Sequence, residues 1–304
     1  MRRGMRCPTE DASIDEKVQQ VWNAKATHSG KSPDRFWFFP QITAHANARI
    51  CGQLLPGSSA GLHQWIKEAG RFAKAVSIGC GMASKELNLV RTGIVESFDL
   101  YEVANERLEK AKQAFASKGL ERSITPICAD AFASSPEDVY DLVYWNSSLH
   151  HMPDVHVALE WSKRALRPGG VLAMYEFIGP TRFQWSDRNL EFVRRFRQAL
   201  PGHLRPPAAD RWIVRPTIDE MIKRDPSEAA DSANILPALL SIFPDATVTT
   251  IGGALYHFGL NGIYPKLREE DAWVFDAALA MDDALLEMGE VHFAAALARK
   301  PLSL

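Results

Sequence analysis

The chain has 304 residues, 46% of them hydrophobic and 24% charged, proportions that are ordinary for a folded globular protein. Lys and Arg number 35 against 37 Asp and Glu, so the formal charge of −2 argues against a surface built wholly to bind nucleic acid. No apolar run approaches the ~18–20 residues that span a bilayer, and the N-terminus lacks the apolar core of a secretory signal. We therefore expect a cytoplasmic protein without nucleic-acid or membrane partners.

The cysteines and histidines form no metal-binding pattern. The four cysteines lie far apart, at Cys7, Cys51, Cys80 and Cys128. They make no Cys-x-x-Cys pair and no Cys/His spacing that suits zinc. We expect free thiols in a reducing compartment and no metal site.

The first part of the chain, residues 1–59, is interpreted as a helical cap. Ser13 and Glu16 form a capping-box pattern, which predicts a helix through Trp22. A polar loop and an aromatic run that includes Trp37 come next. Further helices are expected over 41–51 and 60–70.

From Ala73 onward, short apolar runs alternate with helical patterns. Strands are expected over 73–80, 94–102, 123–128, 140–145, 171–178, 246–251 and 292–300, and helices over 84–92, 104–118, 154–167, 233–243 and 268–288. This alternation predicts an α/β fold with a doubly wound, Rossmann-like sheet over residues 60–304. The regularity weakens over 179–232, and we interpret 179–232 and 258–290 as inserted lid segments at the ligand side.

A glycine-containing turn follows the first strand. Gly79 and Gly81 permit unusual backbone dihedrals and close approach of a ligand at the carboxyl edge of the sheet. Ser84 stands where a dinucleotide motif has its third glycine, so a nicotinamide oxidoreductase is the weakest interpretation. The motif of a phosphate-binding P-loop is absent from the sequence.

Two acidic residues follow the next strands. Glu102 lies 23 residues after Gly79, where an acid can bind the two hydroxyls of a ribose. Asp99 is the competitor, but it lies inside the expected strand. Asp130 follows the third strand and can accept from an exocyclic amine, or it simply caps a turn.

Four blocks in this order, VSIGCGMAS, YEVANERLEKA, CADAF and YDLVYWNSSLHHMPD…LRPGGVLAMYE, span about residues 74–177. Together they resemble the class I S-adenosylmethionine-dependent methyltransferases, in particular a bacterial subgroup that acts on small molecules. The resemblance implies a seven-stranded sheet whose last strand is antiparallel. It also implies S-adenosylmethionine as cofactor and S-adenosylhomocysteine as product.

The resemblance also assigns the cofactor-binding residues. The methionine part would lie against Gly79, Cys80, Gly81 and Asn146, the ribose against Glu102 and Val103, and the adenine against Asp130 and Ala131. Two positions depart from the family pattern. Ser77 stands where an acid is usual and Ala83 where a glycine is common, so the resemblance assigns no acid on this strand to the amino group of the cofactor.

The candidates for catalysis are His150 and His151, which follow the fourth strand, and Tyr256, which ends the sixth. A histidine there can act as a general base, or it can cap and pack structurally. The candidates for acceptor binding are Arg182, Gln184, Trp185, Arg211 and Trp37. For Arg182 the alternatives are binding of a carboxylate and an ion pair within a lid. For Trp37 they are a cover over the acceptor, a homodimer contact and packing on its own domain.

The sequence thus predicts a methyltransferase that acts on a small molecule, favoured as zwitterionic or carboxylated because arginines, acids and aromatics occur together. Methionine S-methylation is one specific hypothesis. N- or O-methylation of a secondary metabolite and a catalytically silent cofactor-binding subunit remain alternatives. A tRNA or DNA methyltransferase is disfavoured by the missing basic stripe and by the lack of an Asn-Pro-Pro-Tyr-type sequence.

Overall fold

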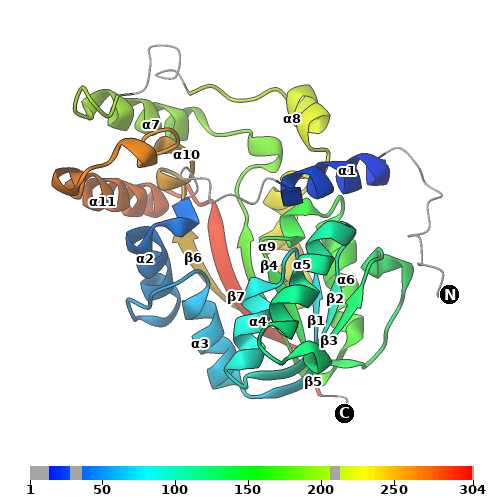
Figure 1. The fold of residues 1–304 in the computed structure, drawn as a ribbon. Helices are drawn as coiled ribbons and strands as arrows, with labels where there is room; N and C mark the ends of the chain where they lie inside the picture. Colours follow the sequence, from blue (N-terminus) through cyan, green and yellow to red (C-terminus); the bar gives the residue numbers. More distant parts are fainter. Residues whose placement is uncertain (1–13, 28–35, 206–212, 303–304) are drawn as a thin grey trace.

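The computed structural model describes residues 14–27, 36–205 and 213–302, and in them seven strands form one sheet. The strands are β1 (Phe72–Ile78), β2 (Val95–Tyr101), β3 (Ile124–Ile127), β4 (Tyr140–Asn146), β5 (Leu166–Phe177), β6 (Thr247–Gly252) and β7 (Phe293–Arg299). Their order across the sheet is β3-β2-β1-β4-β5-β7-β6, and β7 runs antiparallel to both of its neighbours (Figure 1). The predicted seven-stranded, mostly parallel sheet with an antiparallel last strand is confirmed.

Helices cover both faces of the sheet, which is why the central strands are almost continuously apolar. One face carries α2 (Pro40–Cys51), α3 (Ala60–Ala69), α4 (Ser84–Arg91), α5 (Asn105–Ala116) and α11 (Trp273–Glu287), and the other carries α6 (Val155–Ala165) and α9 (Ile235–Ile242). Neighbouring residues of a strand point to opposite faces. Tyr144 of β4 therefore packs in the first core, and Val143 and Trp145 pack in the second.

The helix α1 (Ile14–Thr27) lies against α5 at the edge where the parallel strands end (Figure 1). Gln19 Nε2 donates a hydrogen bond to the Val103 carbonyl at 2.8 Å, and Trp22 lies under the Arg107 guanidinium at 4.4 Å. The capping residue predicted for this helix, Ser13, lies outside the described residues. The N-terminal helices thus pack directly on the sheet domain, and the boundary at residue 59 stays a prediction.

The first predicted insertion contains helices that the sequence analysis did not foresee, α7 (Asp187–Ala199) and α8 (Ile218–Arg224). α7 begins after Ser186, whose side chain accepts from the Asn189 N–H. The short helix α10 (Tyr256–Gly259) begins two residues before the second predicted insertion and precedes α11. The described helices include none that is long and apolar enough to cross a membrane. Three of the cysteines, Cys51, Cys80 and Cys128, are free thiols, and Cys7 lies outside the described residues.

Candidate active site

The strand order reverses between β1 and β4, and the predicted glycine turn lies at this switch point, where open α/β sheets bind ligands. Gly79 has φ +65° and Gly81 has φ +58°, backbone conformations that favour glycine. A Cβ on Gly79 would lie 3.0 Å from the Ser148 Cβ, so a side chain would fill this turn. The N–H groups of Gly79 and Cys80 both donate to the Tyr101 carbonyl, which fixes the turn against the end of β2.

Glu102 directly follows β2, as predicted, and faces the glycine turn. Its Oε2 accepts from the Gly81 N–H at 2.9 Å and its Oε1 from the Ala104 N–H at 2.9 Å. Burial raises the pKa of Glu102, while these backbone bonds and the nearby Arg107 oppose that shift. The competitor Asp99 lies inside β2, where it accepts from the Tyr140 hydroxyl at 2.9 Å and pairs with Lys74. At the ligand edge of β2, the acid is therefore Glu102.

The predicted adenine side is less enclosed. Asp130 is exposed and caps the short helix η3 (Ala131–Ala133) by accepting from the Phe132 N–H at 2.9 Å. Ala131 is buried beneath it. The Val103 carbonyl accepts from Gln19 of α1, so α1 lies next to the residues expected to hold the cofactor. The cofactor contacts of these residues stay predictions.

The two departures from the family pattern have structural counterparts. Ala83 has φ +50°, so the backbone keeps the left-handed conformation that a glycine adopts more easily. Ser77 donates a hydrogen bond of 2.7 Å to Glu86 Oε1 of α4, and Glu86 is only 3% exposed. A buried carboxylate thus lies next to Ser77, but the following helix supplies it. The sequence analysis missed Glu86.

Asn146, at the end of β4, is the centre of a buried polar network. Its Nδ2 donates to the Ser59 hydroxyl at 2.9 Å and to the Tyr144 hydroxyl at 2.7 Å. Its Oδ1 accepts from Lys85 Nζ of α4, and burial lowers the pKa of Lys85. Lys85 and Ser59 were not predicted. The network holds the Asn146 amide rigidly beside the glycine turn.

His150 lies in the short helix η4 (Leu149–His151) and is buried against Glu176 of β5. Its Nδ1 lies 2.7 Å from Glu176 Oε2, while Glu176 Oε1 accepts the N–H groups of Ser148 and Leu149 at 2.9 and 3.0 Å. Because Glu176 is fully buried and accepts all three bonds, it holds the Nδ1 proton of His150 and points Nε2 away from the strand. Sequence reasoning missed Glu176, whose one signal is a lone carboxylate in the apolar run VLAMYEFI.

Opposing effects set the protonation of His150. Burial lowers its pKa, but the hydrogen bond to Glu176 and the charges of Glu176 and Glu228 outweigh burial, so the pKa rises above its ordinary value. His150 Nε2 lies 3.8 Å from Glu228 Oε1. The ring can therefore take up a proton at Nε2 and be stabilised as the cation.

His151 is oriented separately. Its Nδ1 lies 3.3 Å from the Ser227 hydroxyl, which donates its own proton to Asp225 Oδ1 at 2.7 Å. Trp22 of α1 donates to the same hydroxyl and stacks edge-on against the His151 ring, with 4.8 Å between ring centroids. α1 therefore touches the histidine pair as well as the predicted cofactor side.

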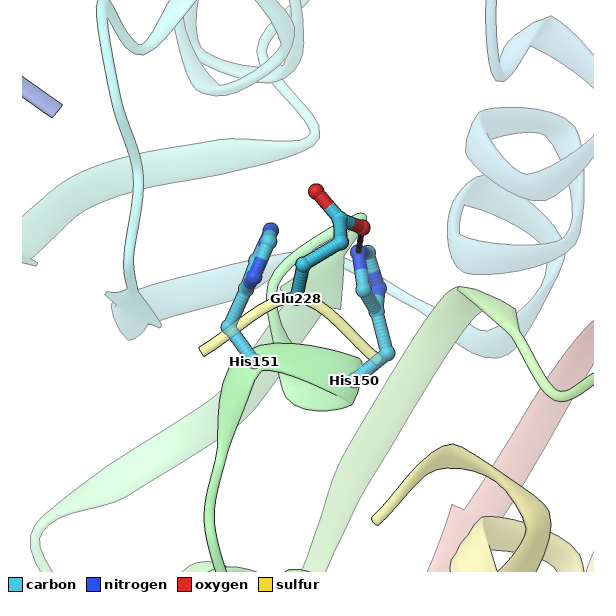
Figure 2. A group of neighbouring side chains, drawn as sticks. All are labelled: His150, His151 and Glu228. Atoms are coloured by element: carbon cyan, nitrogen blue, oxygen red, sulfur yellow. Dashed lines mark ion pairs between the residues drawn. The ribbon is translucent and has the colours of Figure 1, made fainter. Parts of the chain in front are cut away.

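Figure 2 shows that His150, His151 and Glu228 point toward one another. Among the described residues, each of these three side chains offers a ligand atom, and the three atoms lie within 4.8 Å of one another. Two imidazoles and a carboxylate form a donor set that suits divalent transition metals. The sequence analysis did not foresee this grouping, and its expectation of no metal stays a prediction.

The predicted acceptor residues are brought together only in part. Arg182 donates through Nη1 to the Glu228 carbonyl at 3.0 Å, and Gln184 donates to the carbonyls of Arg182 and Pro216. Both residues thus connect loops to one another, which agrees with the alternative that Arg182 bonds within a lid. Arg211 lies outside the described residues. Their contacts with an acceptor stay predictions.

The predicted aromatic residues have different surroundings. Trp185 is 5% exposed and stacks between Phe183 and Phe258, so an acceptor can approach it only by taking the place of a neighbouring ring. Tyr256 is fully buried in α10, and burial raises its pKa, which disfavours a role as a base. Trp37 is 38% exposed and packs edge-on against Phe36.

Comparison with known proteins identifies the domain. Residues 76–174 match the family model described as a methyltransferase domain. These residues therefore form a methyltransferase domain that resembles the class I S-adenosylmethionine-dependent methyltransferases. Over 168 residues, the chain is 32% identical to 27-O-demethylrifamycin SV methyltransferase of Amycolatopsis mediterranei. The match covers 53% of this chain and 54% of that protein, so the chain spans about half the length of this curated relative.

Solved structures share the fold of this chain at low sequence identity. Geranyl diphosphate C-methyltransferase of Streptomyces coelicolor superposes with a TM-score of 0.55 at 11% identity, over 96% of this chain and 100% of that one. The [4+2]-cyclase SpnF superposes with a TM-score of 0.51 at 16% identity, over 99% and 100%. Because one of these proteins is described as a cyclase, the fold by itself does not decide the reaction.

Proposed function

We propose that this protein transfers a methyl group from S-adenosylmethionine to an oxygen or nitrogen of a small molecule, with His150 as the general base. The observation that carries the proposal is the His150–Glu176 pair at the carboxyl end of β4, beside the glycine turn. A base is useful only where the acceptor atom loses a proton. The pair therefore favours an acceptor with an O–H or N–H group.

The residues around the turn fit the cofactor. Gly79 and Gly81 leave backbone space that a side chain would fill, and the Glu102 carboxylate lies within reach of the same space. We assign the methionine part to the glycine turn and Asn146, the ribose to Glu102 and the adenine to Asp130. When bound, the cofactor supplies a methyl group already activated by the positive sulfur. Asn146 and its network would keep the site rigid during the transfer.

In this scheme His150 Nε2 takes the proton of the acceptor, and Glu176 stabilises the imidazolium that forms. A thioether sulfur has no proton to lose, so the pair gives no support to methionine S-methylation. The guanidinium of Arg182, expected to bind a carboxylate, donates to the Glu228 carbonyl instead. A carboxylated or zwitterionic acceptor is therefore not part of the proposal.

The test is a transfer assay with labelled S-adenosylmethionine and the purified full chain. The acceptors are phenols, aliphatic alcohols, amines and L-methionine, and the variant His150→Asn is compared with His45→Asn, whose ring pairs with Asp283 on α11. We expect label on oxygen or nitrogen, lost in His150→Asn and kept in His45→Asn. Label in S-methylmethionine would contradict the assignment of a base. Binding of S-adenosylhomocysteine without transfer to any acceptor would favour the silent-subunit alternative.

A further inference from the structure

Aromatic and imidazole rings from distant parts of the chain pack into one cluster next to His150. We call it the aromatic cluster; its members are Phe36, Phe177, Phe183, Trp185, Tyr256, His257, Phe258, His292 and Phe293. Phe177, the last residue of β5, joins it to the proposed base. Its ring centroid lies 6.0 Å from that of His150 and 5.5 Å from that of His257.

Buried polar atoms of the aromatic cluster lack hydrogen bonds among the described residues. Tyr256 Oη and His257 Nδ1 have no partner. Neither ring nitrogen of His292 makes a well-formed hydrogen bond, and the polar group that acts on this ring is the Gly253 backbone. Tyr256 is fully buried and His292 is 1% exposed. An unpaired buried polar group is costly, and a core that needed only apolar filling would be more stable with Phe at these positions. The unpaired atoms therefore point to a ligand that completes their hydrogen bonds.

The polar groups of the aromatic cluster are neutral. Burial and the nearby His150 lower the pKa of His257 to about 4, and burial lowers the pKa of His292 further. None of the nine members carries a charge at neutral pH. The charged groups next to the cluster already have partners: Glu176 holds His150, and Asp282 accepts from the Gly253 and Leu255 N–H groups. A carboxylate or ammonium placed among the rings would therefore lose its hydration without gaining an unpaired counter-charge. Neutral hydroxyl and carbonyl groups match these donors and acceptors without that penalty.

Phe36 shows that the aromatic cluster accommodates a planar ring. It belongs to the short helix η1 (Phe36–Phe38), and its ring packs 5.3 Å from Tyr256, 5.5 Å from His257 and 5.4 Å from Phe293. A hydrocarbon ring fills the space but cannot pair with a hydroxyl or an imidazole nitrogen. A ring with oxygen substituents would keep the packing and add the missing hydrogen bonds.

We propose that the aromatic cluster is the acceptor site and that it binds a neutral planar ring carrying hydroxyl or carbonyl oxygens, in the space now held by Phe36. The inference rests on the proposed function, because it places the acceptor oxygen beside His150. It names the substrate class, a phenol-like or quinol-like ring, which the sequence analysis did not favour.

The test measures binding of 1,5-dihydroxynaphthalene to the full chain by equilibrium dialysis in the presence of S-adenosylhomocysteine. Naphthalene and L-methionine are the comparison ligands. Tyr256→Phe and His292→Phe remove the unpaired polar atoms and keep a ring. The matched control is Tyr140→Phe, because the Tyr140 hydroxyl already donates to Asp99 at 2.9 Å. Urea midpoints are measured without ligand for every variant.

We expect dihydroxynaphthalene to bind more tightly than naphthalene or L-methionine, and each of the two cluster variants to weaken it about tenfold, the scale of one lost hydrogen bond. The urea midpoint of Tyr256→Phe should stay equal or rise, since no protein bond is lost. The midpoint of His292→Phe also reports on the contact of this ring with the Gly253 backbone. Tyr140→Phe should do the reverse, with a lower midpoint and unchanged binding. A structural role for Tyr256 would instead lower the midpoint of Tyr256→Phe and leave binding unchanged.

Two further outcomes separate this inference from the proposed function. Methyl transfer to an aliphatic amine or alcohol, without binding of dihydroxynaphthalene, would overturn the ring-binding inference and leave the methyltransferase proposal standing. Binding that responds to Tyr256→Phe and His292→Phe, without methyl transfer to any acceptor, would overturn the proposed function and leave the ring-binding site. Equal binding of naphthalene and dihydroxynaphthalene would refute the role of the polar atoms.

Discussion

The substitution Glu176→Gln tests how the proposed base is held. Glu176 is fully buried in β5, with Oε1 on two backbone N–H groups and Oε2 on His150 Nδ1. A glutamine fills the same volume, and its carbonyl oxygen can replace Oε1. Its NH2 group then faces His150, which must accept at Nδ1 and carry its proton on Nε2. In that tautomer, Nε2 cannot take a proton from the acceptor.

The expected loss is the contribution of a general base, about 10²–10⁴ in kcat, or about 3–5 kcal/mol. Among the described residues, the hydrogen-bond partners of Glu176 are Ser148, Leu149 and His150, and those of Glu102 are Gly81 and Ala104. Because the two sets share no residue, affinity for S-adenosylhomocysteine should stay within about twofold. Glu228→Gln is the matched control. Its carboxylate lies 3.8 Å from His150 Nε2 and does not set the tautomer, so we expect less than a tenfold loss.

The assay is the rate of S-adenosylhomocysteine formation between pH 5 and 9. A base must be neutral to act, so the wild-type rate should rise with pH through the raised pKa of His150, above the ordinary 6.5. Without the Glu176 charge, the lowering of the His150 pKa by burial dominates. The rise of any residual rate with pH therefore moves to lower pH. A kcat for Glu176→Gln within threefold of wild type, with an unmoved pH limb, would refute the assignment of His150 as base.

Two other predictions concern cofactor binding and stability. Glu102→Gln should weaken S-adenosylhomocysteine binding about 10–100-fold, the scale of about 1–3 kcal/mol for hydrogen bonds to a charged group. Asp99→Asn should leave the affinity unchanged. Calorimetry that showed the reverse would move the ribose contact to Asp99. Burial, with Lys85, lowers the pKa of His63 to about 4, so the unfolded chain binds a proton that the folded one does not between pH 6.5 and 4. Above pH 6.5 the full stability contribution of neutral His63 should be present, and the unfolding free energy should fall by up to about 3 kcal/mol as the pH drops to 4. Urea titrations at several pH values should find a smaller fall in His63→Gln. Equal pH dependence in both proteins would contradict the burial argument.

The sheet and its flanking helices were predictable because each element carries its own local pattern. The expected helix over 84–92 corresponds to α4, and the expected strand over 292–300 corresponds to β7. α7 was missed although local signals were present. Ser186 caps its first turn, and Glu191 pairs with Arg195 one turn further on. These signals stand outside the strand–helix alternation, which is why the alternation did not reveal them.

The cofactor side of the candidate site was also readable from sequence, and for the same reason. Gly79 and Glu102 belong to one strand–helix–strand unit, so their separation along the chain limits how far apart they lie. The partners of the catalytic candidates are different. Glu176 and Ser227 lie 26 and 76 residues beyond the histidines that they orient. A spacing of that length carries no geometric information until the strands are ordered.

By itself, then, the sequence determined the alternating sheet, the glycine turn and the acid at the end of β2, because each depends on neighbours within one turn or one crossover. Only the tertiary structure decided which carboxylate holds His150 and which rings surround it. β7 lies antiparallel beside β5, so Phe293 pairs with Phe177, and η1 places Phe36 against both α10 and β7. These contacts join residues from opposite ends of the chain, and the physical reason is that burial of apolar faces, rather than any local propensity, selects them.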